Sequence, residues 1–274
     1  RQKMIDWDDA FDNSSYVAGS KNLETNLLRK ATAFREELMH GGFSQFDLRY
    51  GGKERCIFDF FKIKKYPETV IVFIHGGYWH KLSKDHWSHL AYAALKNDLG
   101  FAIPSYNLAP TATLVEITEE IGQFLEFLAH EVSSKFILVG HSAGGHLVTR
   151  MTCKSSNLQA KVRNRILRTI SVSGIYDLQP LLNTKLNDIL GIDLDIAKNE
   201  SPIFLEPFQK SNLIFWVGAE ERPEFLRQAG LIYEKWKGFD INSEINFERG
   251  KNHFSVIDDV KDQNSDLFKR IIGE

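Results

Sequence analysis

Cysteine is scarce in this sequence. The 274 residues include only two cysteines, Cys56 and Cys153, which stand far apart and form no C-x-x-C motif. Small secreted domains that depend on disulfide bonds are rich in cysteine, whereas thiols stay reduced inside cells. The first residues also lack the basic stretch followed by an apolar one that marks a secretory leader. We therefore expect two free thiols and a cytoplasmic protein.

Long hydrophobic runs and an excess of one charge are absent too. The longest apolar stretches, such as residues 69–74 and 135–139, are far shorter than the roughly 20 residues that cross a bilayer. The 34 basic and 36 acidic residues give a formal net charge of −2, and no segment is basic enough for a nucleic-acid surface. We expect neither a membrane span nor a nucleic-acid partner.

Buried strands and amphipathic helices alternate through most of the chain. The composition, 43% hydrophobic and 12% aromatic, is sufficient for a large core. Strands are expected at residues 70–74, 101–104, 136–139, 166–172, 213–217 and 244–247, and helical stripes at 87–95, 114–128 and 225–236. Continuous apolar strands that alternate with helices predict an α/β fold, with a parallel sheet covered by helices on both faces.

Three segments lie outside this alternation. Residues 1–45 are expected to form an arm and a helix, and the stretches 46–50 and 55–63 predict an antiparallel pair because no helix separates them. The segment 176–212 interrupts the rhythm and carries a Leu-rich helical stretch at 178–190. The prediction is a single domain over the whole chain, with an eight-stranded, mostly parallel sheet and a small inserted cap.

The motif G-x-S-x-G at residues 140–144 carries the strongest chemical signal. It lies between the strand expected at 136–139 and a helical stretch at 147–153. This strand–turn–helix context is that of a nucleophile elbow, where small flanking residues let strand and helix approach each other. Ser142 would then occupy a strained turn at a helix N-terminus, where amide dipoles favour developing negative charge. Ser142 is the candidate nucleophile, and a plain glycine-rich turn is the alternative.

A second glycine-rich stretch, Ile74-His75-Gly76-Gly77-Tyr78-Trp79, follows the strand expected at 70–74. Glycine leaves the backbone N–H group open to a substrate oxygen, because no Cβ hinders the approach. Together with the Ala143 amide, the N–H groups of Gly76 and Gly77 are the candidate oxyanion hole. The alternative is a tight turn that needs glycine only for its dihedral angles.

A base and an acid should follow the nucleophile in the order serine, acid, histidine. His253 is the only histidine after the elbow helix, and it comes shortly after the last expected strand. The acid should come from the loop after strand 213–217, which contains Glu220 and Glu221 but no aspartate. We choose Glu221, which stands just before Pro223, and keep Glu220 as the alternative. Both could instead be solvated acids at a helix N-terminus.

Motifs for metals and cofactors are missing. His86 and His89 could share a helix face, but no third ligand stands near them and no HExxH motif occurs. Asp193 and Asp195 lack the glycine and the closing glutamate of a calcium loop. No glycine-rich nucleotide-binding pattern follows a strand. We expect no metal and no cofactor, a small-molecule substrate as partner, and leave a homodimer open.

These motifs together resemble the hormone-sensitive-lipase branch of the α/β-hydrolases, and within it the kynurenine formamidase (arylformamidase) family. The stretches that carry the resemblance are HGGYW at 75–79, SYNLAP at 105–110, GHSAGGH at 140–146, SGIYDL at 173–178 and PEF at 223–225. The resemblance extends from about Asp47 to the C-terminus and is weaker in the first 45 residues. It departs from the family at Glu221, where aspartate is common.

The resemblance implies an α/β-hydrolase fold and hydrolysis of N-formyl-L-kynurenine to L-kynurenine and formate, a step of tryptophan catabolism. The leaving group of this substrate is bulky, so an aromatic pocket should hold it. Tyr78, Trp79 and Tyr176 are the candidates for that pocket, with ordinary core packing as the alternative. Two rival functions remain: a general carboxylesterase that acts on aryl or short acyl esters, and a non-catalytic receptor on a hydrolase scaffold.

Overall fold

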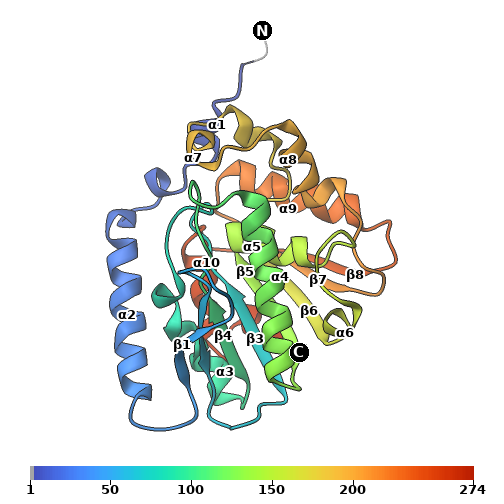
Figure 1. Ribbon diagram of the computed structural model, residues 1–274. Helices are drawn as coiled ribbons and strands as arrows, with labels where there is room; N and C mark the ends of the chain where they lie inside the picture. Colours follow the sequence, from blue (N-terminus) through green and yellow to red (C-terminus); the bar gives the residue numbers. More distant parts are fainter. Residues whose placement is uncertain (1–2) are drawn as a thin grey trace.

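The computed structural model describes residues 3–274, and its strands form one sheet with helices on both sides (Figure 1). The eight strands lie in the order β1-β2-β4-β3-β5-β6-β7-β8. Strand β2 is antiparallel to both β1 and β4, and all the other neighbouring strands are parallel. The predicted eight-stranded, mostly parallel sheet with an antiparallel start is thereby confirmed.

The strands are β1 (Gln45–Arg49), β2 (Ile57–Phe61), β3 (Thr69–Ile74), β4 (Gly100–Pro104), β5 (Lys135–His141), β6 (Ile166–Val172), β7 (Asn212–Gly218) and β8 (Asn242–Glu248). The α-helices are α1 (Trp7–Ala10), α2 (Leu23–Leu38), α3 (Tyr92–Lys96), α4 (Leu114–Glu131), α5 (Ala143–Met151), α6 (Ala160–Arg163), α7 (Asn187–Leu190), α8 (Leu194–Asn199), α9 (Pro223–Trp236), α10 (Ser255–Asp258) and α11 (Asp266–Ile272). Short 3₁₀ helices are η1 (Ser14–Tyr16), η2 (Ser20–Asn22), η3 (Lys84–His86), η4 (Ser88–Ala91), η5 (Gln179–Asn183), η6 (Pro202–Phe204) and η7 (Asp259–Lys261).

The sheet separates two hydrophobic cores. Side chains alternate between the faces along a strand, so Val70 and Val72 of β3 pack in the core with α4 and α5. Ile71 and Phe73 of the same strand pack in the opposite core, with η4, α3 and α11. The central strands are apolar at consecutive positions because both of their faces are buried.

Two expected helices are broken in the structure. Residues 87–95 form η4 and the five-residue α3 instead of one α-helix, and residues 178–190 form η5 and α7. The second break occurs at Thr184, which has extended dihedral angles. The next amide, Lys185 N–H, donates to Asp8 Oδ1 of the N-terminal arm at 2.7 Å. A contact with a distant segment therefore ends a helix that the apolar spacing alone would continue.

The N-terminal arm and the segment 176–212 lie at the same end of the sheet. Figure 1 shows α1, α7 and α8 together above the start of α5, which follows β5 directly. This is the edge at which the parallel strands have their carboxyl ends, where α/β folds place their ligands. Within residues 3–274, no helix combines the length and the apolarity needed to cross a membrane.

Candidate active site

Ser142 occupies a strained turn between β5 and α5, with φ 58° and ψ −118°. Left-handed dihedral angles are costly for a residue with a Cβ, so the surrounding structure must hold them. The Ser142 N–H donates to Val172 O at 2.9 Å. A Cβ on Gly140 would lie 2.0 Å from Gly144 O, and a Cβ on Gly144 would lie 1.9 Å from Ile74 O. The close approach of strand, turn and helix therefore requires glycine on both sides of the serine.

Three polar side chains form a continuous chain of hydrogen bonds. Ser142 Oγ lies 3.0 Å from His253 Nε2, and His253 Nδ1 lies 2.6 Å from Glu221 Oε1. Ser142 follows β5, Glu221 follows β7 and His253 follows β8, so all three stand at carboxyl ends of parallel strands. All three residues are buried. The arrangement has the geometry of a nucleophile, its base and an acid that orients the base.

The Glu221 carboxylate is fixed by two further donors. Its Oε2 accepts hydrogen bonds from the Gly218 N–H at 2.6 Å and from Ser173 Oγ at 2.5 Å. Glu220 instead is exposed, and its N–H donates to Lys251 O. The structure thus brings Glu221, and not Glu220, to His253. Ser173 belongs to the SGIYDL stretch, but no sequence motif assigned it a contact with the acid.

His141 is a neighbour that sequence reasoning missed. It is buried, and its ring centroid lies 4.9 Å from that of His253. His141 Nε2 is 2.7 Å from the backbone oxygen of His253 and must donate there, because a carbonyl only accepts. Burial, followed by the nearby His253, holds the pKa of His141 well below its usual range, so the ring is neutral. The hydrogen bond fixes the loop that carries His253. The motif G-x-S-x-G tolerates any residue at this position and gave no signal.

Three backbone amides are the candidate oxyanion hole: those of Gly76 and Gly77, which line the same cavity as Ser142, and that of Ala143, the residue after Ser142. A Cβ on Gly76 would lie 3.0 Å from Ser142 Cβ and 2.8 Å from His141 O, so this glycine abuts the serine. Gly77 has φ 112°, and a Cβ there would lie 2.4 Å from Lys81 O. Within residues 3–274, neither glycine N–H has a hydrogen-bond acceptor. Ala143 opens α5, so its N–H has no intrahelical partner.

His75 stabilises the loop that contains Gly76 and Gly77. Its Nδ1 lies 2.6 Å from Gly76 O, to which it donates, and the Tyr106 hydroxyl donates to His75 O at 2.8 Å. The two rings stack with centroids 4.4 Å apart. Burial lowers the pKa of His75 to about 3, so this ring stays neutral and keeps its position. Tyr106 lies in the SYNLAP stretch, so this stretch supports the glycine loop through His75.

A cavity of about 350 Å³ opens beside Ser142 and His253. Nine of its twenty lining residues, from Phe11 to Leu27, belong to the N-terminal arm and the start of α2. The sequence signal for this contribution was absent, because the arm carries no motif. The volume is that of a site for a small organic molecule.

Of the three aromatic residues expected in the pocket, only Tyr78 lines this cavity. Trp79 is fully buried in the core, and its Nε1–H donates to His146 Nδ1 at 3.3 Å. Tyr176 is also fully buried; its hydroxyl pairs with Ser171 Oγ at 2.6 Å, and its ring packs against Phe215. The expectation that Trp79 and Tyr176 line the pocket is therefore wrong. Loop residues show no periodicity that would tell a core-facing ring from a cavity-facing one.

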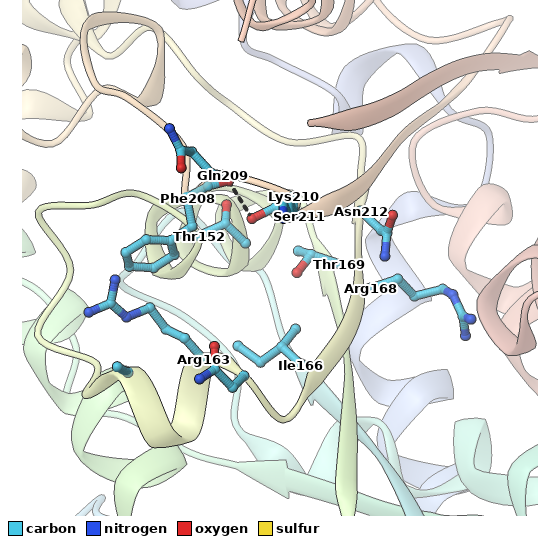
Figure 2. A pocket seen from close by; sticks show the side chains of 12 residues that line it. Thr152, Arg163, Ile166, Arg168, Thr169, Phe208, Gln209, Lys210, Ser211 and Asn212 are labelled. Atoms are coloured by element: carbon cyan, nitrogen blue, oxygen red, sulfur yellow. Dashed lines mark hydrogen bonds between the residues drawn. The ribbon is translucent and has the colours of Figure 1, made fainter. Parts of the chain in front are cut away.

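A second hollow, of about 400 Å³, lies at the opposite edge of the sheet (Figure 2). It is bounded by the starts of β6 and β7 and by three basic residues, Arg163, Arg168 and Lys210. The Arg163 guanidinium stacks 3.7 Å above the Phe208 ring. None of its lining residues is acidic or a histidine, so this hollow has no base to activate a nucleophile. The candidate active site is therefore the cavity beside Ser142.

The histidine pair that was considered for a metal has other contacts. His86 Nε2 faces Glu24 Oε1 at 3.6 Å, and both ring nitrogens of His89 are buried without a partner in the described part of the chain. Among residues 3–274, no three His, Cys, Asp or Glu side chains are grouped so as to hold a metal ion.

Known proteins are similar to this chain in sequence and in fold. A family model described as BD-FAE matches residues 60–217, which is more than half of the chain. The chain belongs to the BD-FAE family. The match begins in β2 and ends in β7, so this family segment contains the Gly76-Gly77 loop and Ser142 but neither Glu221 nor His253.

Relatives of this BD-FAE protein extend the comparison beyond the family segment. The kynurenine formamidase of Danio rerio is 29% identical over 210 residues, which are 74% of this chain and 71% of the fish protein. The kynurenine formamidase of Drosophila melanogaster is 24% identical over 246 residues, covering 85% of this chain and 82% of the fly protein. The kinship with kynurenine formamidases that the motifs indicated is confirmed.

Solved structures agree with the BD-FAE assignment. A presumed thioesterase from Silicibacter sp. TM1040 superposes with a TM-score of 0.90 and 38% identity, covering 98% of this chain and 100% of that protein. Esterase B from Lactobacillus rhamnosis superposes with a TM-score of 0.66 at 14% identity, covering 89% and 91%, and shares the fold. The protein is a hydrolase with the α/β-hydrolase fold.

Proposed function

We propose that this chain is a serine hydrolase that cleaves the formamide of N-formyl-L-kynurenine to give L-kynurenine and formate. The observation that carries the proposal is the chain of hydrogen bonds from Ser142 through His253 to Glu221, inside a cavity beside free backbone amides. The kinship with kynurenine formamidases supports the choice of substrate.

The proposed reaction has two steps. Ser142 Oγ attacks the formyl carbon while His253 Nε2 takes the hydroxyl proton, and Glu221 keeps the imidazole oriented through Nδ1. The amides of Gly76, Gly77 and Ala143 would stabilise the oxyanion. His253 then gives its proton to the arylamine nitrogen, so L-kynurenine leaves and Ser142 keeps the formyl group. Water, activated by His253, releases formate and restores the serine.

Hydrolysis of esters or thioesters is the second candidate. The 38% identical structural relative is a presumed thioesterase, and the same serine, histidine and amides would serve an ester as well. The difference lies in the leaving group, because an arylamine must be protonated as it departs whereas a thiolate or phenolate leaves readily.

A comparison of substrates tests the proposal. We would measure kcat/KM of the purified protein for N-formyl-L-kynurenine, for p-nitrophenyl acetate and for an acetyl thioester. The expected result is a higher value for the formamide, in spite of its poorer leaving group. Turnover of the ester or thioester without formamide cleavage would mean that the protein is an esterase or thioesterase and not a formamidase. No turnover of any of the three, with no labelling of Ser142 by a fluorophosphonate, would favour the receptor.

A further inference from the structure

Asn13 lies in the wall of the candidate active-site cavity. It is only 5% exposed, and it lines the same cavity as Ser142 and His253. Asn13 Nδ2 donates to the Tyr78 hydroxyl oxygen at 3.2 Å, while the Tyr78 hydroxyl donates its proton to the Phe11 carbonyl. A phenol has only one proton, so towards Asn13 the Tyr78 oxygen can only accept. This decides which end of the Asn13 amide is the nitrogen.

The oxygen end of the same amide is unpaired. Asn13 Oδ1 is buried and has no hydrogen-bond partner among residues 3–274. Buried polar atoms in folded proteins are almost always paired, so an exception in the wall of a binding cavity requires an explanation. Oδ1 only accepts, so the group that pairs with it must carry an N–H or an O–H. Because Asn13 lines the cavity, a ligand can supply that donor once a small shift of the side chain uncovers Oδ1.

A second unpaired group in this wall is a donor. Trp87 is 4% exposed and lines the cavity, and its Nε1–H has no partner in the described part of the chain. The cavity wall therefore offers one unpaired acceptor and one unpaired donor. A leaving group that carries both N–H groups and oxygens has a partner for each of the two.

The charge beside Asn13 favours a cationic N–H group. The neighbouring residue Asp12 also lines the cavity. The Ser15 N–H donates to Asp12 Oδ1 at 3.1 Å. Hydrogen bonds from Ser15 lower the pKa of Asp12, so this carboxylate is ionised at neutral pH. Glu24, Lys21 and Lys81 also line the cavity, so its charges are balanced as a whole. The carboxylate next to the unpaired amide oxygen is the local feature that suits an ammonium group.

The arm that carries Asn13 is fixed to the body of the protein. Arg222 Nη2 donates to Asp9 Oδ2 at 2.8 Å, and the Arg222 guanidinium lies 3.5 Å above the Tyr16 ring. Arg222 directly follows Glu221, so the arm is attached to the loop that orients His253. Asn13 therefore belongs to a wall that is in place before the substrate arrives, which lowers the entropic cost of binding.

We propose that Asn13 is a specificity residue that accepts a hydrogen bond from the α-ammonium group of an amino-acid leaving group, while Trp87 donates to an oxygen of the same group. The inference rests on the proposed function, in which the leaving group is an arylamine with an α-amino acid side chain. Asn13 does not contact the reacting bond; it selects substrates that carry the ammonium group.

The experiment compares two substrates and four variants. N-formyl-L-kynurenine carries the ammonium group, and formanilide shares the scissile formamide but lacks the amino acid. Asn13→Leu removes the acceptor at nearly the same volume, and we expect a roughly 5- to 20-fold higher KM for N-formyl-L-kynurenine with kcat nearly unchanged. Formanilide kinetics should change less than about twofold on the same grounds. Asn22→Leu is the matched control, because Asn22 is exposed on the same arm and lies outside the cavity. It should leave KM and kcat for both substrates unchanged.

Asn13→Asp separates binding from a structural role. It keeps an acceptor oxygen and adds a negative charge, but like Asn13→Leu it loses the hydrogen bond that Nδ2 donates to Tyr78. The KM for N-formyl-L-kynurenine should therefore be lower than in the Leu variant. An Asp variant as impaired as the Leu variant would overturn the proposal, because the group that meets Asn13 would then not be a cation. Equal losses on both substrates with Asn13→Leu would also overturn it. If the Leu variant does not fold, the Asp variant and Trp87→Phe, which removes the N–H together with the five-membered ring that carries it, decide the question.

The outcome also distinguishes this inference from the proposed function. Cleavage of N-formyl-L-kynurenine by the unsubstituted protein, together with an unaffected Asn13→Leu variant, would leave the function in place and overturn the role of Asn13. No cleavage of N-formyl-L-kynurenine by the unsubstituted protein would overturn both. The labelling rate of Ser142 by a fluorophosphonate shows in each variant whether the site is intact.

Discussion

At the scale of single residues, the backbone at Ser142 is strained, and the close packing at Gly140 and Gly144 maintains the strain. A non-glycine residue with φ 58° costs of order 1–3 kcal/mol. The adjacent glycines allow α5 to start so close to β3 that a methyl group at Gly144 would collide with Ile74 O. The strain presents the Ser142 hydroxyl to His253 at the N-terminus of a helix.

Substitution of the proposed nucleophile or base should abolish turnover. Ser142→Ala and His253→Ala should each lower kcat by on the order of 10⁶, since the two groups act as one unit in serine hydrolases. Single-turnover assays with the best substrate measure the loss, and Ser133→Ala, at an exposed serine, is the control. Substantial activity in either variant would refute the mechanism.

Substitution of the two glutamates after β7 should lower kcat to very different extents. In Glu221→Gln, one amide oxygen can still accept from Gly218 and Ser173, but the NH₂ group would face His253 Nδ1 and favour the wrong tautomer. We expect kcat to fall roughly 10³- to 10⁴-fold. Glu220→Gln, at an exposed carboxylate, should have nearly no effect. The reverse order in steady-state assays would mean that Glu220 is the acid.

At the scale of elements, a buried ion pair connects α5 to the segment 176–212. Arg150 Nε of α5 lies 3.1 Å from Glu200 Oε2, and Thr118 of α4 donates to the same oxygen at 3.0 Å. Both charged side chains are nearly enclosed, at 8% and 6% exposure. His146 of α5 also donates to the Glu200 backbone oxygen at 2.7 Å. The elbow helix and the segment above it therefore share one polar network.

Breaking this pair should destabilise the protein. Glu200→Ala leaves the Arg150 charge buried without a partner, and we expect a loss of about 3–5 kcal/mol in the free energy of unfolding. Urea denaturation measures the loss. Glu206→Ala removes a carboxylate from an exposed pair with Lys154 and should cost about 0–1 kcal/mol. Similar losses in both variants would contradict a structural role of the buried pair. The double variant Arg150→Met with Glu200→Leu should recover much of the stability.

At the scale of the whole molecule, four buried histidines link stability to pH. Burial lowers the pKa of His75 to about 3 and the pKa values of His89 and His146 to about 4, and it holds that of His141 well below its usual range. These rings are neutral in the folded protein and bind protons on unfolding at their ordinary pKa near 6.5. A lowered pKa in the folded state therefore stabilises the protein above about pH 6.5, and this stability is lost as the pH falls towards 4.

The expected pH dependence is steep. Four extra protons on the unfolded chain give a slope that approaches about 5 kcal/mol per pH unit below pH 6. Urea denaturation at several pH values between 5 and 7.5 measures this slope. His89→Leu removes one of the four rings, which has no hydrogen-bond partner in the described chain. This variant should reduce the slope by about 1.4 kcal/mol per pH unit. An unchanged slope would mean that His89 does not contribute to the pH dependence of the stability.

Local patterns in the sequence determined the alternation of strands and helices, the elbow at residues 140–144 and the glycine loop at 75–79. These features follow from short-range sterics and from periodicity, which neighbouring residues alone establish. The predicted cap at 176–212 and the cytoplasmic location stay predictions.

Only the tertiary structure decided which glutamate contacts His253, that Trp79 and Tyr176 belong to the core, and that the arm with Asn13 closes the cavity. Each of these depends on contacts between residues far apart in the chain, such as Asp9 and Arg222, which are 213 positions apart. Periodicity carries no information about such pairs, because the packing of the complete sheet and its loops brings them together.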